Sequence, residues 1–475
     1  MRTTPIWAAL VALVTACGGA PAAEPPPEQQ GDDLDSLDLA NSWTDATNPK
    51  SPDLAGPIWW PWVMKLRGPK YELHAVASGR PREPIAVFSG SGFAETGAFQ
   101  LAAGHYGVLV QYKENGTAAD GASLADVTLS DYEGGALMTV EPLGALTVSS
   151  DNPVGSGGWR RAYFRFEVTA GDDGLVRRVH LENATQSGWQ FGLVAVHREE
   201  RPFYGIAHNP DSVARLYQAI AQGANALEPD LRHTKDAPNI AADEDGNVAV
   251  TEQGIFGGAS DVNGQATLGS YLRELGQVAP HKLVIWDTKT GDSKDYGAMA
   301  QSIKAAGARE GFDFGKSVFN ISDGSMSGLF WPFADDAAVG RDFDGIFTQV
   351  HSHTADEWMG PVRANRITFQ GLGVTPQLQV NEKWSVPIAV YVRAREQEEF
   401  PKKIYFWTVN DGNAMRRVLD LGIDGLITDD LPLLQSILQE PPYASMYRYA
   451  GEDDDPGAKH GGSWFSVAAS EDLDP

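Results

Sequence analysis

Only one cysteine, Cys17, occurs among the 475 residues, so no disulfide can form within the chain and its stability must come from packing. Basic residues are also few: 37 Lys and Arg stand against 63 Asp and Glu, for a formal net charge of -26. Because nucleic acids are bound through clustered cations, this balance argues against a nucleic acid partner. A fixed short repeat is absent too, which argues against a solenoid. With 42% hydrophobic residues, the chain is long enough for two or three domains with cores of their own.

The N-terminal segment 1–17 reads MRTTPIWAALVALVTAC, with one basic residue, a short apolar run and a small-residue end. The run is shorter than the roughly 20 residues of a membrane span, so it predicts a secretory signal peptide. Its ending, VTAC, resembles a bacterial lipobox in which Cys17 is acylated. We therefore expect the protein to be exported and anchored by a lipid in the bacterial cell envelope, at the outer membrane. The alternative is an ordinary signal peptide and a secreted protein. Segment 18–50, rich in Pro, Ala and acid, is predicted to be a disordered tether.

Between residues 51 and 200, short apolar runs are separated by Gly, Asp and Asn. Runs such as YGVLVQY and RAYFRFEVT are typical of strands, and their spacing predicts an antiparallel β-sandwich, jelly-roll-like in type. Aromatic residues in a sandwich can form a sugar-binding platform or belong to the core, which is the commoner case. The candidates are Trp59, Trp60, Trp62, Trp159 and Trp189. We expect this domain to position or shield the one that follows.

From residue 201 to 442, strand-like runs alternate with amphipathic stretches. FYGIAH precedes SVARLYQAIAQG, for example, and KIYFWTV precedes NAMRRVLDLG. About eight such strands predict an α/β TIM barrel, with a doubly wound open sheet as the alternative. Residues 443–475 are predicted to form an acidic C-terminal tail.

Polar residues stand where the predicted barrel strands end, and those carboxyl ends meet at one rim. Three carboxylates gathered there would repel one another unless a cation neutralised them. Oxygen ligands without thiols favour Mg²⁺ or Ca²⁺, and Mg²⁺ beside a phosphate is the usual arrangement. Each acid alone could be a loop residue or a helix cap, but together they predict a metal site. The strand-end residues are His208, Glu228, Asp230, Asp287, Lys289, Trp407 and Asp429.

The barrel region also contains three longer blocks: GIAHNPDSVARLYQAIAQGANALEPDL, LVIWDTKTGD and KIYFWTVNDGNAMRRVLDLGIDGLITD. They resemble the sphingomyelinase D and phospholipase D group within the glycerophosphodiester phosphodiesterase-like superfamily, in that group's order. The resemblance covers the barrel and not the sandwich. It implies an Mg²⁺-dependent phosphoric diester hydrolase or lyase that acts on a choline phospholipid or a related phosphodiester. In that group the headgroup alcohol leaves as a neighbouring lipid hydroxyl attacks, which gives a cyclic phosphate.

The resemblance further implies roles for individual residues. His208 matches the catalytic histidine of the first strand, and Lys289 matches the lysine that helps to hold the phosphate. The matches to the Mg²⁺ ligands are Glu228, Asp230 and Asp287. Tyr405 and Trp407 match aromatic residues of the substrate pocket, where a choline headgroup could be held by cation-π attraction, and Asp429 replaces the asparagine of that pocket.

The group also carries a second catalytic histidine, soon after the strand that ends in Glu228 and Asp230. In this chain the segment DEDGNVAVTEQG aligns with that region, and Gln253 stands in place of the histidine. Glutamine donates a hydrogen bond but delivers no proton at neutral pH, and loss of a general acid costs about 10²- to 10⁴-fold. A different register places Glu244 at this position. Of the other histidines in the barrel region, His233, His351 and His353 follow strand ends and are loop residues or substitutes for the missing acid, whereas His281 precedes a strand, away from the predicted site.

Three functions follow as hypotheses. The first is a lipid-anchored phospholipase D or sphingomyelinase D-like phosphodiesterase, attenuated or altered by Gln253. The second is a catalytically inactive surface lipoprotein that binds phosphate headgroups or glycans. The third is a glycerophosphodiesterase for small soluble substrates, although AHNP stands where those enzymes usually carry His-Arg-Gly. The oligomeric state is left open.

Overall fold

The computed structural model describes residues 57–61, 64–67, 70–74, 83–88, 91–114, 120–148, 158–185, 188–233, 248–250, 268–289, 296–321, 340–344, 369–373, 382–459 and 464–467. All of them lie within one compact unit, Thr44–Pro475. The predicted signal peptide with Cys17 and the predicted tether lie outside the described residues. None of the helices in the described ranges combines the length and the hydropathy that a membrane crossing requires.

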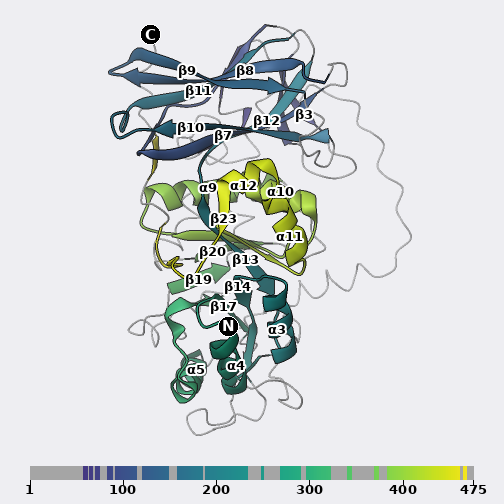
Figure 1. Cartoon of the computed structure of the whole chain (residues 1–475), viewed down its shortest axis with the longest axis vertical. Helices are drawn as coiled ribbons and strands as arrows, with labels where there is room; N and C mark the ends of the chain where they lie inside the picture. The colour runs from purple at the N-terminus through teal and green to yellow at the C-terminus, as the bar shows by residue number, and fades with distance from the viewer. Residues whose placement is uncertain are drawn as a thin grey trace, which may run out of the picture. The chain divides into compact units, whose positions relative to one another are not determined.

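The N-terminal domain consists of two antiparallel β-sheets, which Figure 1 shows as two layers. The first sheet has the order β10-β7-β12-β4-β3, with β1 beside β12. Its strands are β1 (Ile58–Trp59), β3 (Lys70–His74), β4 (Glu83–Phe88), β7 (Gly104–Glu114), β10 (Arg160–Val168) and β12 (Trp189–Arg198). The second sheet has the order β2-β5-β11-β6-β24, and β11 also pairs with β8, which pairs with β9. Its strands are β2 (Lys65–Arg67), β5 (Phe93–Glu95), β6 (Phe99–Leu101), β8 (Ser123–Glu133), β9 (Ala136–Thr147), β11 (Val176–Asn183) and β24 (Phe465–Val467).

Apolar side chains from both sheets form one core between the layers. Alternation along the strands places them there: in β11, Val179 and Leu181 are fully buried and their neighbours are less so. Trp59 and Trp189 belong to this core, and Trp189 stacks on Phe88 at 4.7 Å between ring centroids. These two tryptophans therefore serve packing rather than a sugar platform. Trp62 lies outside the described residues.

The predicted acidic tail contains a strand of the first domain. Within 443–475, β24 pairs antiparallel with β6, so the end of the described chain returns to the N-terminal domain. Trp464 and Phe465 are each only 2% exposed and pack in its core. The two domains are therefore linked twice, once before β13 and once through this strand.

The C-terminal domain is built on parallel strands. Among the described residues, eight strands pair in parallel as a closed ring, in the order β13-β14-β17-β18-β19-β20-β21-β22 and back to β13. They are β13 (Arg201–His208), β14 (Ala226–Glu228), β17 (Leu283–Lys289), β18 (Ser317–Ile321), β19 (Gly340–Asp344), β20 (Phe369–Gly373), β21 (Lys403–Trp407) and β22 (Gly425–Thr428). A closed ring favours the predicted α/β barrel over the open sheet. Strands β15 (Asp230–His233), β16 (Val248–Val250) and β23 (Tyr447–Tyr449) extend this sheet.

Helices connect the strands and lie outside the ring (Figure 1). Their apolar positions recur at helical spacing, as in α10, where Met415, Val418 and Leu419 are buried while the intervening residues are more exposed. The described helices are α3 (Val213–Ala221), α4 (Leu268–Val278), α5 (Tyr296–Glu310), the 3₁₀ turn η4 (Phe314–Lys316), α9 (Glu382–Gln397), α10 (Gly412–Asp420), α11 (Leu431–Leu438) and α12 (Pro441–Met446).

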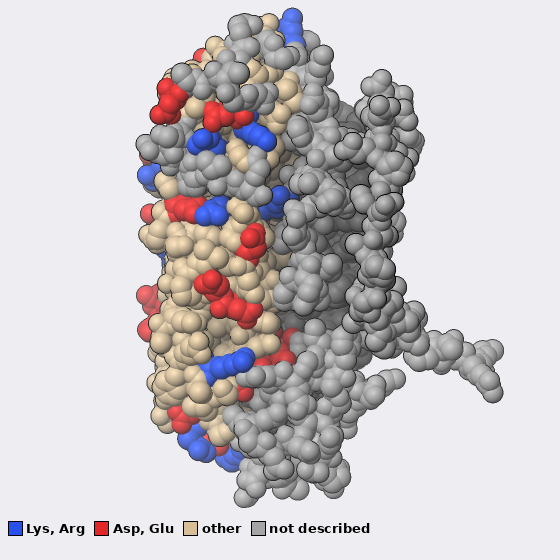
Figure 2. All heavy atoms as spheres, turned by 90° about the vertical axis from the view of Figure 1, so that its right-hand side faces the viewer, with Lys and Arg blue, Asp and Glu red and all other residues tan. Residues whose placement is uncertain are grey.

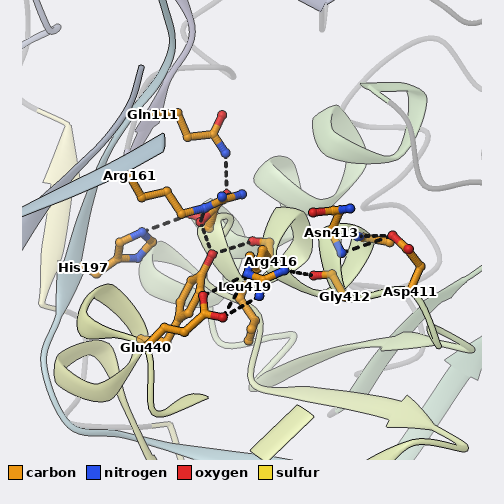
Figure 3. Close-up of polar contacts among 12 residues, drawn as sticks. Gln111, Arg161, His197, Asp411, Gly412, Asn413, Arg416, Leu419 and Glu440 are labelled. Carbon is orange, nitrogen blue, oxygen red and sulfur yellow. Dashed lines mark hydrogen bonds and ion pairs between the residues drawn. The ribbon is translucent and has the colours of Figure 1, made fainter. Parts of the chain in front are cut away.

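A buried ion pair joins the two domains (Figure 3). Arg161 on β10 donates from Nε and Nη2 to both carboxylate oxygens of Asp420, the last residue of α10, each at 2.7 Å. Asp420 is fully buried, and it also accepts hydrogen bonds from Gln111 and, at 2.7 Å, from the Tyr443 hydroxyl. Because α10 ends where the chain turns back toward the start of β22, the contact lies at the amino-terminal ends of the barrel strands. The N-terminal domain thus contacts the barrel away from the strand ends that carry the predicted chemistry.

We expect the buried His197 to make this contact sensitive to pH. The ring lies 2% exposed, with Nε2 3.1 Å from the backbone oxygen of Asp420, and burial together with the nearby Arg201 lowers its pKa to about 3. An unfolded histidine binds a proton below a pKa near 6.5, so the unfolded state gains protons first as the pH falls. We expect His197 alone to reduce the free energy of unfolding by about 2 kcal/mol between pH 7 and pH 5.

Denaturant unfolding of the wild type and of His197→Gln at both pH values measures this contribution. Glutamine can still donate to the Asp420 oxygen but does not titrate, so its stability should fall less with acid. His281→Gln, which changes an exposed histidine before β17, is the matched control and should keep the wild-type dependence. An unchanged dependence in His197→Gln would contradict the prediction.

Candidate functional site

Three buried carboxylates gather where strands β14, β15 and β17 meet. Glu228 ends β14, Asp230 begins β15 after a single proline, and Asp287 pairs with Asp230 across the parallel strands. One ligand oxygen from each lies within 4.8 Å of those of the other two. The residues are 6%, 4% and 7% exposed, respectively. The structure thus brings together the three acids that the sequence predicted as metal ligands.

The loop after β13 helps to set the positions of these acids. Asp211, itself buried, accepts a hydrogen bond at 2.8 Å from the backbone N–H of Asp230. Asn209 adopts a left-handed backbone with φ of 47°, a conformation that asparagine tolerates better than most residues, and its N–H donates to the Glu228 backbone oxygen at 3.0 Å. Tyr271 donates its hydroxyl to the Pro210 oxygen at 2.8 Å, which ties helix α4 to the same loop.

The donor set fits a hard divalent cation. Three carboxylates offer oxygen ligands only, and a buried cluster of like charges is costly unless a cation neutralises it. Among the described residues this is the one group of at least three His, Cys, Asp or Glu residues with ligand atoms so close together. Glu228, Asp230 and Asp287 are therefore the residues that would hold the metal.

His208 ends β13, next to β14, and its register partner there is Glu228. Its Nδ1 lies 2.8 Å from Oδ1 of Asp429, which directly follows β22. The hydrogen bond from His208 lowers the pKa of Asp429, so the carboxylate is ionised at neutral pH. With Nδ1 donating to this carboxylate, Nε2 is the ring nitrogen left for proton transfer. Asp429, predicted to bind substrate, is thus a partner of the predicted catalytic histidine.

The two predicted pocket aromatics occupy different levels of β21. Trp407, at the carboxyl end, is half-buried and packs at the edge of the barrel core. Tyr405 is only 2% exposed and lies within that core among Ile206, Leu283 and Ile427. The structure therefore leaves Trp407 as a candidate for contact with substrate, whereas the burial of Tyr405 does not support a role in lining the pocket.

Other predicted residues are placed only in part. Lys289 is the last residue of β17, two positions beyond Asp287, and nothing is described of its side chain. His233 ends β15 in the same way. Gln253, Glu244, His351 and His353 lie outside the described residues.

The structure adds two residues that sequence reasoning missed. Asn410 donates from Nδ2 to Oδ2 of Asp429 at 2.6 Å, and Asp211 supports the backbone of Asp230. Both stand in loops directly after barrel strands, in the motifs TVND and HNPD, and that position is the feature by which they could have been found.

Comparison with known proteins finds relatives of the barrel half of the chain. The family model described as dermonecrotic toxin SPH matches residues 345–457. A dermonecrotic toxin of Loxosceles reclusa is 23% identical over 292 residues, which cover 55% of this chain and 91% of the toxin. Another from Hemiscorpius lepturus is 25% identical over 293 residues, covering 55% of this chain and 85% of the toxin. A solved glycerophosphodiester phosphodiesterase from Parabacteroides distasonis, 16% identical, covers 50% of this chain and 98% of its own with a TM-score of 0.39.

These matches confirm the resemblance predicted from the three sequence blocks. Over the barrel half, the chain is similar to dermonecrotic toxins, in line with the predicted resemblance to the sphingomyelinase D and phospholipase D group. Residues 345–457 include β21, β22 and Asp429, so the matched region contributes one side of the site.

Proposed function

We propose that this chain is a Mg²⁺-dependent phosphodiesterase of the phospholipase D type that releases the headgroup alcohol from a choline phospholipid or a related phosphodiester. The observation that carries the proposal is the meeting of His208 with the acids Glu228, Asp230 and Asp287 at one end of the barrel. A catalytic imidazole beside a hard-cation site combines proton transfer with charge neutralisation, and both accelerate phosphodiester cleavage. The similarity to the toxin family supports the same class of reaction.

The three acids would hold Mg²⁺, which neutralises charge on the phosphoryl oxygens when it is bound. In the proposed reaction a neighbouring lipid hydroxyl attacks phosphorus and the bond from phosphorus to the headgroup oxygen breaks, which leaves a cyclic phosphate. Nε2 of His208 accepts the proton of the attacking hydroxyl, while Nδ1 stays hydrogen-bonded to Asp429. The departing alcohol needs a proton in turn. Gln253, expected opposite His208, can donate a hydrogen bond to that oxygen but no proton, so the departing alcohol takes its proton from solvent water and we expect turnover to be attenuated.

The choline headgroup is the preferred leaving group because of Trp407. A quaternary ammonium over an indole face gains about 1 to 2 kcal/mol, and Trp407 is the half-buried aromatic at the carboxyl end of β21. The proposed location is the bacterial cell envelope, at the outer membrane, with Cys17 acylated; the alternative is a secreted protein.

Choline release tests the proposal directly. Vesicles of sphingomyelin or micelles of lysophosphatidylcholine should yield choline with Mg²⁺ present, and EDTA should reduce the rate to background until Mg²⁺ is restored. The phosphorus NMR spectrum of the product distinguishes a cyclic from an open phosphate. Glycerophosphocholine, a small soluble diester, serves as the comparison substrate and should react more slowly.

Two results would redirect the assignment. Faster cleavage of glycerophosphocholine than of either lipid would favour the small-substrate glycerophosphodiesterase. No choline from any of the three substrates, with Mg²⁺ or Ca²⁺ supplied, would contradict an active enzyme, and vesicle binding without turnover would then support the headgroup-binding alternative.

A further inference from the structure

His208 is the first member of a hydrogen-bonded chain that crosses three neighbouring strands of the barrel. Its Nδ1 meets Oδ1 of Asp429 at 2.8 Å, and Oδ2 of Asp429 meets Nδ2 of Asn410 at 2.6 Å. The three residues follow or end β13, β22 and β21, which pair side by side. The His208 side chain is 25% exposed and that of Asp429 is 53% exposed, so the chain lies at the rim.

The orientation of the Asn410 amide is fixed by its other contacts. Its Oδ1 accepts from the backbone N–H of Asp429 at 2.8 Å and from the Thr428 hydroxyl at 2.9 Å. The Thr428 oxygen in turn accepts from the backbone N–H of Asp430 at 3.0 Å, so its own proton is directed to Asn410. A flipped amide would place its NH₂ against two donors. The group that faces Asp429 is therefore the NH₂ of Asn410.

This arrangement restricts which side chain works at position 429. A carboxylate offers an acceptor to both neighbours, to Asn410 on one side and to His208 on the other. An amide would have to turn its oxygen to the NH₂ of Asn410, and its own NH₂ would then face His208. The imidazole could accept that hydrogen bond only with Nδ1 unprotonated, which moves its proton to Nε2.

We propose that Asp429, oriented by Asn410, is a positioning residue that holds the proton of His208 on Nδ1 and leaves the lone pair of Nε2 for the substrate. The inference rests on the proposed function, in which Nε2 accepts the proton of the attacking hydroxyl. The amide of Asn410, in the loop after β21, has a fixed orientation, and that orientation determines which atom of residue 429 can face His208.

Exchanging the two side chains tests the inference. Asp429→Asn should transfer the His208 proton to Nε2 and reduce kcat by at least about a hundredfold, since the wrong tautomer cannot accept a proton at the reacting nitrogen. KM should change less than kcat, because Asp429 and Asn410 act on the reaction through the His208 imidazole. The double variant Asn410→Asp with Asp429→Asn restores an acceptor opposite the new amide, so the amide at position 429 can again turn its oxygen to His208. This variant should recover the Nδ1 tautomer and most of the rate.

The tautomer is read from the nitrogen NMR shifts of labelled histidine in the full chain, with the His208 resonance assigned from its loss in His208→Gln. The rate is choline release from lysophosphatidylcholine with Mg²⁺. Asp430→Asn, the same substitution one residue further along, serves as the matched control, because an asparagine can still cap helix α11 through the Leu433 N–H. It should leave the tautomer and the rate within about twofold of the wild type.

The NMR measurement separates this inference from the proposed function. If the wild type releases no choline but shows the proton on Nδ1 of His208, and Asp429→Asn moves it, the proposed function fails and the positioning role stands. An Asp429→Asn variant that keeps the proton on Nδ1 overturns the inference, whatever its rate. So does a double variant that folds like the wild type but leaves the proton on Nε2.

Discussion

Replacement of Asp287 by Asn should reduce the rate of the Mg²⁺-dependent reaction at least about a thousandfold, the largest effect we expect from any single substitution. A metal that neutralises a reacting phosphate contributes several kcal/mol to the barrier, and each 1.4 kcal/mol is about a factor of ten in rate. Asp287 is buried and lies within 4.8 Å of the other two acids, so an amide there removes a charge that no neighbour replaces.

The same substitution should leave the fold intact or strengthen it when no metal is added. Three buried carboxylates repel one another, and neutralising one relieves that repulsion. Wild-type protein should gain about 2.7 kcal/mol of stability at a Mg²⁺ concentration a hundred times its dissociation constant, whereas Asp287→Asn should gain almost nothing. Opposite effects on stability and on activity separate the loss of a ligand from misfolding.

Thermal unfolding with and without Mg²⁺, together with choline release, measures both effects. Asp313→Asn is the matched control, because Asp313 is exposed and caps the short turn η4. It should keep the wild-type response to Mg²⁺. Full Mg²⁺ stabilisation of Asp287→Asn would show that the three acids do not hold the metal.

The metal-ligand candidates could be found from sequence because of a property of the fold. The parallel strands of a barrel end at one rim, so acidic residues at the strand ends lie near one another whatever the orientation of their side chains. Glu228 and Asp287 follow from that rule alone. The role of Asp429 does not follow from that rule, because a position at a strand end places a residue at the rim but does not show which neighbouring side chain it contacts. That neighbour became known only when Asn410 and His208 were placed beside it.

Tyr405 shows the limit of the same rule. Alternation along β21 directs Tyr405 and Trp407 to the same side of the strand, and the sequence block assigned both to the substrate pocket. Depth within the barrel separates them, because a strand carries one inward layer nearer the rim and another nearer the centre. The lower layer is filled with apolar side chains, and Tyr405 belongs to it.

Long-range contacts between the domains had no sequence pattern that could predict them. Arg161 and Asp420 are 259 residues apart, and either would ordinarily be read as an exposed residue on its strand or helix. The return of β24 to the N-terminal domain was likewise hidden in a segment whose acidic composition predicts a tail. In both cases, residues far apart in the sequence come into contact only in the folded structure, so local sequence patterns do not predict the contact.

Loss of the Arg161 side chain should be the most destabilising of the substitutions at the domain contact. Arg161→Ala leaves the fully buried Asp420 without its cation, and breaking a buried pair in this way costs about 3 to 5 kcal/mol. Burial alone would lower the pKa of Arg161, but the carboxylate of Asp420 and other nearby groups together raise it by more, so the guanidinium is charged in the folded state. We expect the free energy of unfolding to fall by that amount and the two domains to unfold in separate transitions.

Arg165 on the same strand provides the matched control. It also donates two hydrogen bonds to a carboxylate, that of Glu199, at 2.6 Å each, but its side chain is 66% exposed, whereas that of Arg161 is 7% exposed. Water reaches the exposed Arg165 end of this pair, although the Glu199 side chain is only 4% exposed, so Arg165→Ala should cost less than Arg161→Ala, in whose pair neither partner is exposed. The variant Arg161→Met with Asp420→Leu, which replaces the pair with apolar side chains, should recover much of the stability lost in Arg161→Ala. Denaturant unfolding followed by tryptophan fluorescence compares the three variants. Equal losses in Arg161→Ala and Arg165→Ala would mean that burial of the pair does not hold the domains together.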